Sequence, residues 1–313
     1  MKTIRSPHLN LLFCLAASAA AISCSKSTDE SGTTADADGP PVVQAVNYPL
    51  AYFAQRLGGD LIDLRFLPGE TDGDPAFWEP GEKDVIALQA ADLILLNGAT
   101  YAKWRDKTSL PESILVDTSA TFQGEFMESG FTVTHSHGKD GMHSHGGTAF
   151  TTWMDFQQAL WQAEAIRDAL VQLLPDQKAT IETNFEALAK DLDTLHAEFK
   201  SIGEAIGNQP LMASHPVYQY FARRYGLNLK PVLWEPEVVP DDAAIEDLKG
   251  KLKDHPAKWM IWEGDPAPES VEKIKALGLG SVVVDPCGNR PDSGDWLSVM
   301  KRDAENLKAI AAP

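Results

Sequence analysis

The sequence predicts an α/β protein with two lobes, each with a mostly parallel sheet flanked by helices, and one long helix that bridges them. Three observations lead to this fold class. Short apolar strand candidates alternate with helix candidates on both sides of the middle of the chain, which is typical of parallel sheets covered by helices. The middle itself, residues 155–205, is helical by its apolar spacing. One helix candidate there continues beyond Pro175 for 27 residues without Gly or Pro.

Size and charge limit the class of protein. The chain has 313 residues, which suits about two domains. It carries 45 acidic and 27 basic residues, for a net charge of -18. Binding to phosphate backbones needs clustered Lys and Arg, so this balance argues against nucleic acid as a partner.

The first 24 residues have the pattern of a lipoprotein signal peptide. Lys2 and Arg5 precede an apolar run, 9–23, that is short for a bilayer span and ends in small residues. The sequence A-I-S-C at 21–24 resembles the lipobox of bacterial lipoproteins, in which the cysteine carries the lipid. We therefore predict lipidation at Cys24, with an ordinary signal peptide cut nearby as the alternative.

A polar segment, 25–41, follows Cys24 and lacks large apolar side chains, so we predict a disordered tether. Cys14 lies in the apolar run and Cys24 is the predicted lipid site, which leaves only Cys287 in the mature chain and excludes an intramolecular disulfide. The predicted location is the cell envelope, periplasmic or at the cell surface, with contact to the membrane through the lipid anchor.

The first predicted lobe spans 42–154. Strand candidates alternate with helix candidates in the order strand 42–48, helix 49–60, strand 60–68, helix and strand within 83–98, and strand 113–119. Pro49 lies near the start of the first helix and Gly58-Gly59 at its end, as helix boundaries favour.

The helical middle, 155–205, contains one helix before Pro175 and a second after it that is about 40 Å long. The second predicted lobe spans 206–313. Its strand candidates are 211–216, 229–235, 259–264 and 281–286, and its helix candidates are 217–226, 243–254, 268–278 and 294–312.

Ligands of open α/β sheets bind at the carboxyl ends of the strands, so the residues that close the strand candidates are the first candidates for a site. His215, Glu263 and Asp285 each close such a strand. A fourth candidate is the segment GDPAFWEP, residues 73–80, which includes Trp78 and Glu79. Each of these residues has a purely structural alternative, such as a helix cap or a salt bridge.

The segment THSHGKDGMHSHGG, residues 134–147, holds four of the eight histidines of the chain. These are His135, His137, His143 and His145. Neutral imidazole is a ligand of transition metals, so the pattern indicates contact with metal, and a solvated spacer is the alternative. A flexible, glycine-rich loop loses conformational entropy on binding, so we expect weaker capture than at a preformed site. Capture should weaken as the pH falls through about 6 to 6.5.

The order of these segments resembles the metal-binding receptors of bacterial ABC importers for zinc and manganese, nearest to the zinc-uptake type. The resemblance runs from about 42 to 307 and includes VVQAVNYPLAYFAQRLGGD, DPAFWEP, the histidine segment, WMDFQQALWQAEAIRDAL, ASHPVYQYFARRYGL, WMIWEG and VVVDPCG. It implies two α/β lobes bridged by a rigid helix, a metal in the cleft between them, and delivery to an ABC importer permease. His215 and Asp285 stand at positions where the resemblance implies metal ligands.

Two positions depart from the family's pattern. Ala76 stands where the resemblance implies a histidine, in D-P-A-F-W-E-P, and Thr151 stands at the second such position, in AFTTWMD. One interpretation is that His143 and His145 fold back as substitute ligands, while His135 and His137 capture metal. The alternative is a divergent cleft, lined by Phe77 and Trp78, for a non-zinc, chelated or organic ligand, with the histidine segment only as a metal buffer.

The motifs of the common catalytic classes are absent from the sequence, including G-x-S-x-G, H-E-x-x-H and the phosphate-binding glycine patterns. A metallohydrolase built on the H-x-H units is a third hypothesis, but these units lie in a glycine-rich segment and not at a strand end. We therefore predict a binding protein and not an enzyme. Imidazole-rich surroundings favour zinc as the transported metal, with manganese, copper or nickel as lesser candidates.

Overall fold

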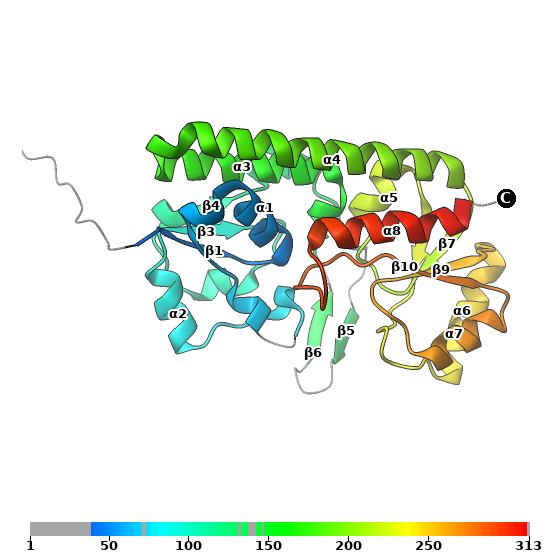
Figure 1. Ribbon diagram of the computed structural model, residues 1–313. Helices are drawn as coiled ribbons and strands as arrows, with labels where there is room; N and C mark the ends of the chain where they lie inside the picture. The colour runs from blue at the N-terminus through cyan, green and yellow to red at the C-terminus, as the bar shows by residue number, and fades with distance from the viewer. Residues whose placement is uncertain (1–38, 71–72, 131–132, 137–141, 146, 312–313) are drawn as a thin grey trace, which may run out of the picture. The chain divides into compact units, whose positions relative to one another are not determined.

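Two four-stranded sheets form the framework of the protein (Figure 1). The computed structural model describes residues 39–70, 73–130, 133–136, 142–145 and 147–311. The first sheet contains β1 (Val42–Ala45), β2 (Asp63–Arg65), β3 (Leu93–Leu96) and β4 (Leu115–Asp117), in the order β2-β1-β3-β4. The second contains β7 (Pro210–Ala213), β8 (Asn228–Pro231), β9 (Trp259–Trp262) and β10 (Gly280–Val283), in the order β10-β9-β7-β8. Every pairing within both sheets is parallel.

Helices cover both sheets. They are α1 (Tyr48–Gly58), α2 (Glu82–Gln89), α3 (Phe156–Leu173), α4 (Lys178–Ile206), α5 (Gln219–Tyr225), α6 (Asp242–Asp254), α7 (Pro268–Lys275) and α8 (Trp296–Ala311). Capping side chains fix several starts: Asn47 accepts a hydrogen bond from the Leu50 N–H at α1, and Asp241 accepts one from the Ala244 N–H at α6. This arrangement confirms the predicted fold class.

The bridging helix α4 has 29 residues and is therefore about 44 Å long. It packs against α1 and α3 on the side of the first sheet and against α5 and α8 on the side of the second. Its buried side chains recur every three or four residues, as one apolar face of a helix requires. Those buried residues are Ile181, Leu188, Leu192, Leu195, Phe199, Ile202, Gly203 and Ile206.

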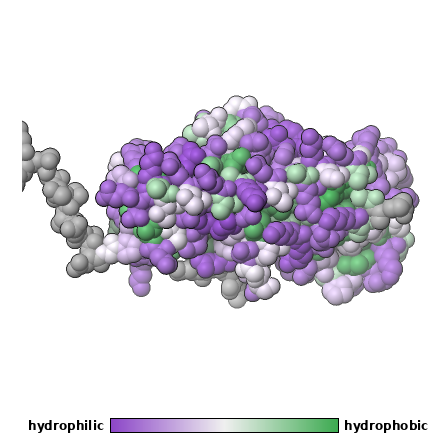
Figure 2. Space-filling model, turned by 45° about the horizontal axis from the view of Figure 1, so that its top comes forward, coloured by the Kyte–Doolittle hydropathy of each residue, from purple (hydrophilic) through white to green (hydrophobic). Residues whose placement is uncertain are grey.

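One hydrophobic core is continuous through both lobes. It joins Val43 and Ile94 of the first sheet, through α4 and α8, to Leu211 and Ile261 of the second. A smaller cluster, which includes Met260, covers the other face of the second sheet. Residues 39–313 form one compact unit, so the two lobes are fixed to each other by packing. Figure 2 shows a mainly hydrophilic face with only scattered apolar areas, as expected where the apolar sides of the helices are turned inward.

Several elements differ in extent from the predicted ones. The strand predicted at 60–68 is only β2, because the chain forms short 3₁₀ turns on either side of it. The strand predicted at 229–235 is only β8, which ends at Pro231. The lobe boundaries near 154 and 206 stay predictions. The signal peptide 1–24, Cys24 and nearly all of the tether 25–41 lie outside the described residues. Within the described part of the chain, no helix combines the length and apolar character needed to cross a membrane.

A buried carboxylate connects the lobes beside the bridging helix. Asp155, whose side chain is fully buried, caps α3 by accepting hydrogen bonds from the Gln157 and Gln158 N–H groups. It also forms ion pairs with Arg224 Nε at 2.6 Å and Arg223 Nη2 at 3.4 Å, both on α5. One side chain therefore holds the start of α3 against a helix of the second lobe.

Replacement of Asp155 should destabilise the protein strongly. Asp155→Ala removes a helix cap and leaves two partly buried guanidinium groups without their carboxylate, so we expect a loss of about 3 kcal/mol in the free energy of unfolding. Urea unfolding measures the loss. Asp168→Ala is the matched control, because Asp168 forms an exposed ion pair with Arg167 and should cost less than about 0.5 kcal/mol. Equal losses of stability in the two variants would show that Asp155 does not stabilise the contact between α3 and α5.

Candidate metal centre

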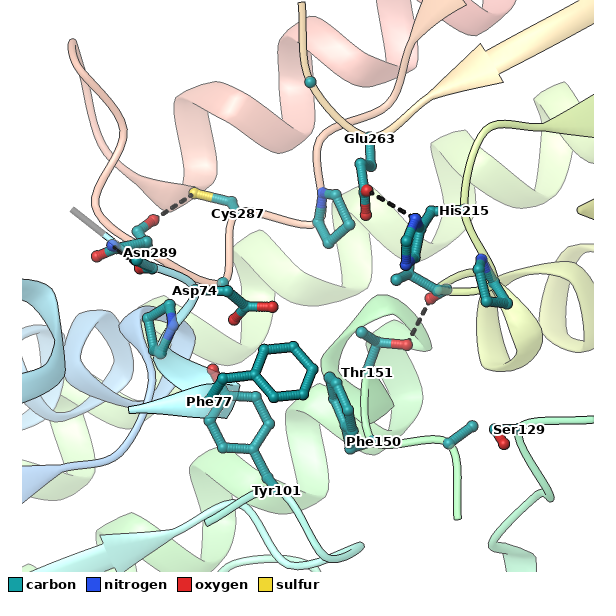
Figure 3. A pocket seen from close by; sticks show the side chains of 18 of the residues that line it. Asp74, Phe77, Tyr101, Ser129, Phe150, Thr151, His215, Glu263, Cys287 and Asn289 are labelled. Atoms are coloured by element: carbon teal, nitrogen blue, oxygen red, sulfur yellow. Dashed lines mark hydrogen bonds and ion pairs between the residues drawn. The ribbon is translucent and has the colours of Figure 1, made fainter. Parts of the chain in front are cut away.

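A cleft of about 1020 Å³ lies where the chain leaves the carboxyl ends of both sheets (Figure 3). The first lobe lines it with residues of 73–79, 100–103 and 148–153, and the second lobe with residues of 215–219, 235–237 and 285–289 together with Glu263 and Gly264. This is the position at which open parallel sheets bind ligands.

Three side chains of the second lobe converge in the cleft. His215, Glu235 and Glu263 each offer one ligand atom, and these atoms all lie within 4.8 Å of one another. His215 Nδ1 is 3.4 Å from Glu263 Oε1 and 3.7 Å from Glu235 Oε1. An imidazole between two carboxylates at this spacing is a donor set that divalent transition metals accept.

Sheet order explains the convergence. The three residues follow β7, β8 and β9, and β7 lies between the other two strands. Ser214, just after β7, holds both neighbouring segments: its carbonyl accepts a hydrogen bond from the Trp234 N–H, and its hydroxyl accepts one from the Glu263 N–H. The backbone around His215 therefore positions both glutamates.

The electrostatics of this group favour a bound cation. Burial, followed by the negative charges of Glu235 and Asp74, raises the pKa of Glu263 well above its usual range. Burial, followed by the charges of Glu237 and Asp74, raises the pKa of Glu235 to about 7. Burial and mutual repulsion both favour the protonated form of these carboxyl groups, and a divalent ion bound between them favours the ionised form.

Asp285 lies at the same edge of the sheet but outside the group of three. It follows β10, which is separated from β7 by β9, so its strand is about 10 Å from that of His215. Its carboxylate accepts a hydrogen bond from the Cys287 N–H at 2.7 Å and lies 3.5 Å from Arg302 Nη2. Asp285 lines the cleft, and its predicted role as a metal ligand stays a prediction.

The first lobe places other groups at the two positions where the resemblance implies histidine. Ala76 is buried and donates its N–H to Asp74. Thr151 is buried too, and its hydroxyl donates to the carbonyl of Val217 in the second lobe. Thr151 therefore connects the two sides of the cleft.

The other first-lobe candidates line the cleft. Trp78 packs edge to face on Trp104, with ring centroids 5.5 Å apart, and Glu79 forms an exposed ion pair with Lys107 at 2.7 Å. Both residues lie apart from the three converging donors, so their place in a site stays a prediction.

The histidine segment forms a two-stranded ribbon and not the loop that the sequence predicts. β5 (Val133–Ser136) pairs antiparallel with β6 (Met142–His145), so His135 lies opposite His143 and Val133 opposite His145. His137 lies outside the described residues. Threonine and valine at alternate positions favour a strand, which the glycine content of the segment obscured.

The ribbon is anchored at the rim of the cleft. Ser129 N–H donates to the Gly147 carbonyl at 2.7 Å, and Ala149 N–H donates to the Met127 carbonyl at 2.8 Å. Ser129 and Thr148, which flank the ribbon, line the cleft. The predicted role of His143 and His145 as substitute ligands, and of His135 and His137 as capture groups, stays a prediction.

Sequence reasoning singled out His215 and Glu263 but missed Glu235. The signal was present, because Glu235 closes the strand candidate LKPVLWE as Glu263 closes WMIWE. Regular strand pairing ends at Pro231, yet the Val232 N–H still donates to the carbonyl of Ala213, the last residue of β7, and the Trp234 N–H donates to the carbonyl of Ser214, just after it. This irregular continuation brings Glu235 to the level of His215.

Two lobes with parallel sheets, a cleft at their carboxyl ends and converging donors define a two-lobed α/β binding protein. Residues 43–310 match the family model described as zinc-uptake complex component A, periplasmic, and the chain belongs to this family. The resemblance seen in the sequence is confirmed.

The chain is also similar in sequence to curated relatives and in fold to a solved structure. The chain is 24% identical over 285 residues to the zinc-binding lipoprotein AdcA of Streptococcus pneumoniae strain R6. The match covers 88% of this chain and 56% of AdcA, so the chain spans little more than half the length of that relative. It is 25% identical over 313 residues to the manganese ABC transporter substrate-binding lipoprotein ScaA of Streptococcus gordonii, with 95% of each chain covered. The crystal structure of the metal-dependent lipoprotein YcdH from Bacillus subtilis superposes with a TM-score of 0.72 at 21% identity, covering 86% of this chain and 97% of YcdH.

Removal of one carboxylate should change how the stability of the metal-free protein depends on pH. The pKa of Glu235 is about 7 in the folded protein and 4.5 for an unperturbed side chain, so the proton favours the folded state. This contribution is complete below pH 4.5 and is lost as the pH rises through 7. Glu235→Gln abolishes the loss, so between pH 5 and 8 the metal-free wild type should lose about 2 kcal/mol more stability than the variant.

Urea unfolding at both pH values, with metal removed by a chelator, measures this difference. Glu272→Gln is the control, because Glu272 is an exposed residue of α7. If Glu235→Gln and Glu272→Gln show the same pH dependence as the wild type, burial and the neighbouring carboxylates do not raise the pKa of Glu235 as described.

Proposed function

We propose that the protein captures a divalent transition metal in its interlobe cleft and delivers it to an ABC importer. The observation that carries this proposal is the convergence of His215, Glu235 and Glu263 at the carboxyl end of the second sheet. Burial and neighbouring negative charges raise the pKa of Glu235 and of Glu263, and a bound cation favours the ionised form of both carboxyl groups. Membership of a family named for zinc uptake supports the delivery step.

Zinc is the cargo that we propose. Its usual protein ligands include imidazole nitrogen and carboxylate oxygen at about 2.0–2.2 Å, and three protein ligands leave a position open for exchange. AdcA, by its name, binds zinc. Manganese is the second candidate, because two carboxylates suit a harder ion and ScaA is named for manganese. Copper and nickel rank below both.

The predicted envelope location extends this proposal. A lipid on Cys24 and the tether 25–41 would hold the receptor near its permease, and AdcA and ScaA are both named lipoproteins. We also propose that the protein is not an enzyme, since the family is one of uptake components. The alternative of a cleft for an organic ligand without a metal gains no support from the relatives.

The histidine ribbon serves, in this proposal, as an accessory that captures metal at the rim. The three donor atoms that converge in the cleft do not come from the ribbon. Ser129 and Thr148, at the base of the ribbon, line the cleft. A metal ion held loosely by the ribbon would therefore be released close to the converging donors.

Zinc titration with a competing chromophoric chelator tests the proposal. The wild type should bind one zinc ion tightly and further ions weakly. His215→Ala and Glu263→Gln should each weaken the tight site at least about 100-fold, because a ligand is lost from a site that has few. His196→Ala is the matched control, since it removes an imidazole that lies next to Tyr225 and outside the cleft.

A variant without residues 134–147 should keep the tight site and lose the weak ones. Wild-type affinity in His215→Ala would show that the cleft is not the site. Loss of the tight site in the deletion variant would show instead that the ribbon histidines are its ligands.

A further inference from the structure

The cleft is larger than a bare metal ion requires. Donor atoms surround zinc at about 2 Å. Pockets of about 300–1,000 Å³ hold small organic molecules. The cleft, at about 1020 Å³, is at the upper end of that range, while the three converging donors occupy only its second-lobe side.

Direct hydrogen bonds across the lobes fix the width of the cleft. Trp153 Nε1 donates to the Pro286 carbonyl at 2.7 Å, and the Tyr220 hydroxyl donates to the Ala149 carbonyl at 2.8 Å. Thr151 makes a third such bond. With one core continuous through both lobes, closing of the cleft around a bare ion would break buried bonds.

The wall opposite the donors is aromatic. Figure 3 shows Phe77, Tyr101 and Phe150 across the cleft from His215 and Glu263. Tyr101 and Phe150 pack edge to face with ring centroids 5.1 Å apart, which holds both rings in place. Phe77 and Phe150 are partly exposed and offer apolar surface to a ligand, and none of the three side chains offers a nitrogen donor to a metal.

One polar group in this wall has no hydrogen-bond partner among the described residues. The Tyr101 hydroxyl is buried, and the described residues provide no hydrogen bond to it, although Tyr101 lines the cleft. A buried hydroxyl without a partner costs free energy, and a ligand that hydrogen-bonds to it would recover that cost. The hydroxyl therefore indicates an organic ligand that reaches the wall.

The charges around the cleft restrict the class of that ligand. Six carboxylate side chains line it: Asp74, Glu79, Glu235, Glu237, Glu263 and Asp285. Among the described residues that line the cleft, Lys103 alone carries a permanent positive charge, and it is exposed. A polycarboxylate chelator would be repelled, whereas a metal complex with net positive charge is attracted.

We propose that the cleft takes its metal as a complex with a small nitrogen-donor chelator of the amino-acid class, such as one that bears an amine and an imidazole. This inference rests on the proposed function, since the metal itself is held by His215, Glu235 and Glu263. The chelator supplies the nitrogen donors that Ala76 and Thr151 do not, packs against Phe77 and Phe150, and hydrogen-bonds to the Tyr101 hydroxyl.

Equilibrium dialysis with radiolabelled L-histidine tests the inference. Zinc-loaded protein should retain about one histidine per protein chain, and metal-free protein should retain none. Tyr101→Phe should weaken histidine retention at least about 5-fold and leave the affinity for zinc alone unchanged. Tyr225→Phe is the matched control, because Tyr225 is a buried tyrosine that does not line the cleft. Labelled citrate should not be retained.

The outcomes separate this inference from the proposed function. Tight binding of zinc without retention of histidine overturns the inference alone, and absence of zinc binding overturns the proposed function. Retention of histidine by metal-free protein, retention of citrate in place of histidine, or unchanged histidine retention in Tyr101→Phe also overturns the inference.

Discussion

The parallel pairing of β7 with β8 on one side and β9 on the other is the constraint on which the site depends. Neighbouring strands lie about 4.8 Å apart, so residues that close them at the same level come within reach of one ion. Ser214 strengthens this constraint, because one residue holds the segments of both glutamates. The three candidate donors therefore belong to one sheet edge.

All three candidate donors belong to the second lobe, so the first lobe contributes other groups to the cleft. The first lobe holds Ala76 and Thr151 where the resemblance implies imidazoles, and Thr151 now serves as a hydrogen-bonded link across the cleft. In the second lobe, His215 and two glutamates converge as candidate donors. The first-lobe side of the cleft carries the aromatic side chains of Phe77, Tyr101 and Phe150, which offer no nitrogen donor to a metal.

Much of the fold could be predicted from the sequence, because helix and strand periods, Gly and Pro at boundaries, and the uninterrupted helix after Pro175 are local signals. The site was only partly predictable. The residues that close the predicted strands include His215, Glu263 and Asp285. Which of these side chains come close together depends on the strand order β10-β9-β7-β8, and local sequence patterns do not give that order. Glu235 escapes a reading by strand ends because the chain after β8 continues toward the cleft without regular pairing. The glycines of the histidine segment predict a loop, and its β-branched residues are too few to indicate β5 and β6 from the sequence alone.

X-ray absorption spectroscopy of the protein loaded with one equivalent of zinc, in buffer free of nitrogen chelators, tests the central claim most directly. Coordination by His215, Glu235 and Glu263 predicts a shell of nitrogen and oxygen donors with the multiple-scattering signal of a single imidazole. A signal from two or more imidazoles would contradict this account, because it would require histidines other than His215 to bind the tightly held metal.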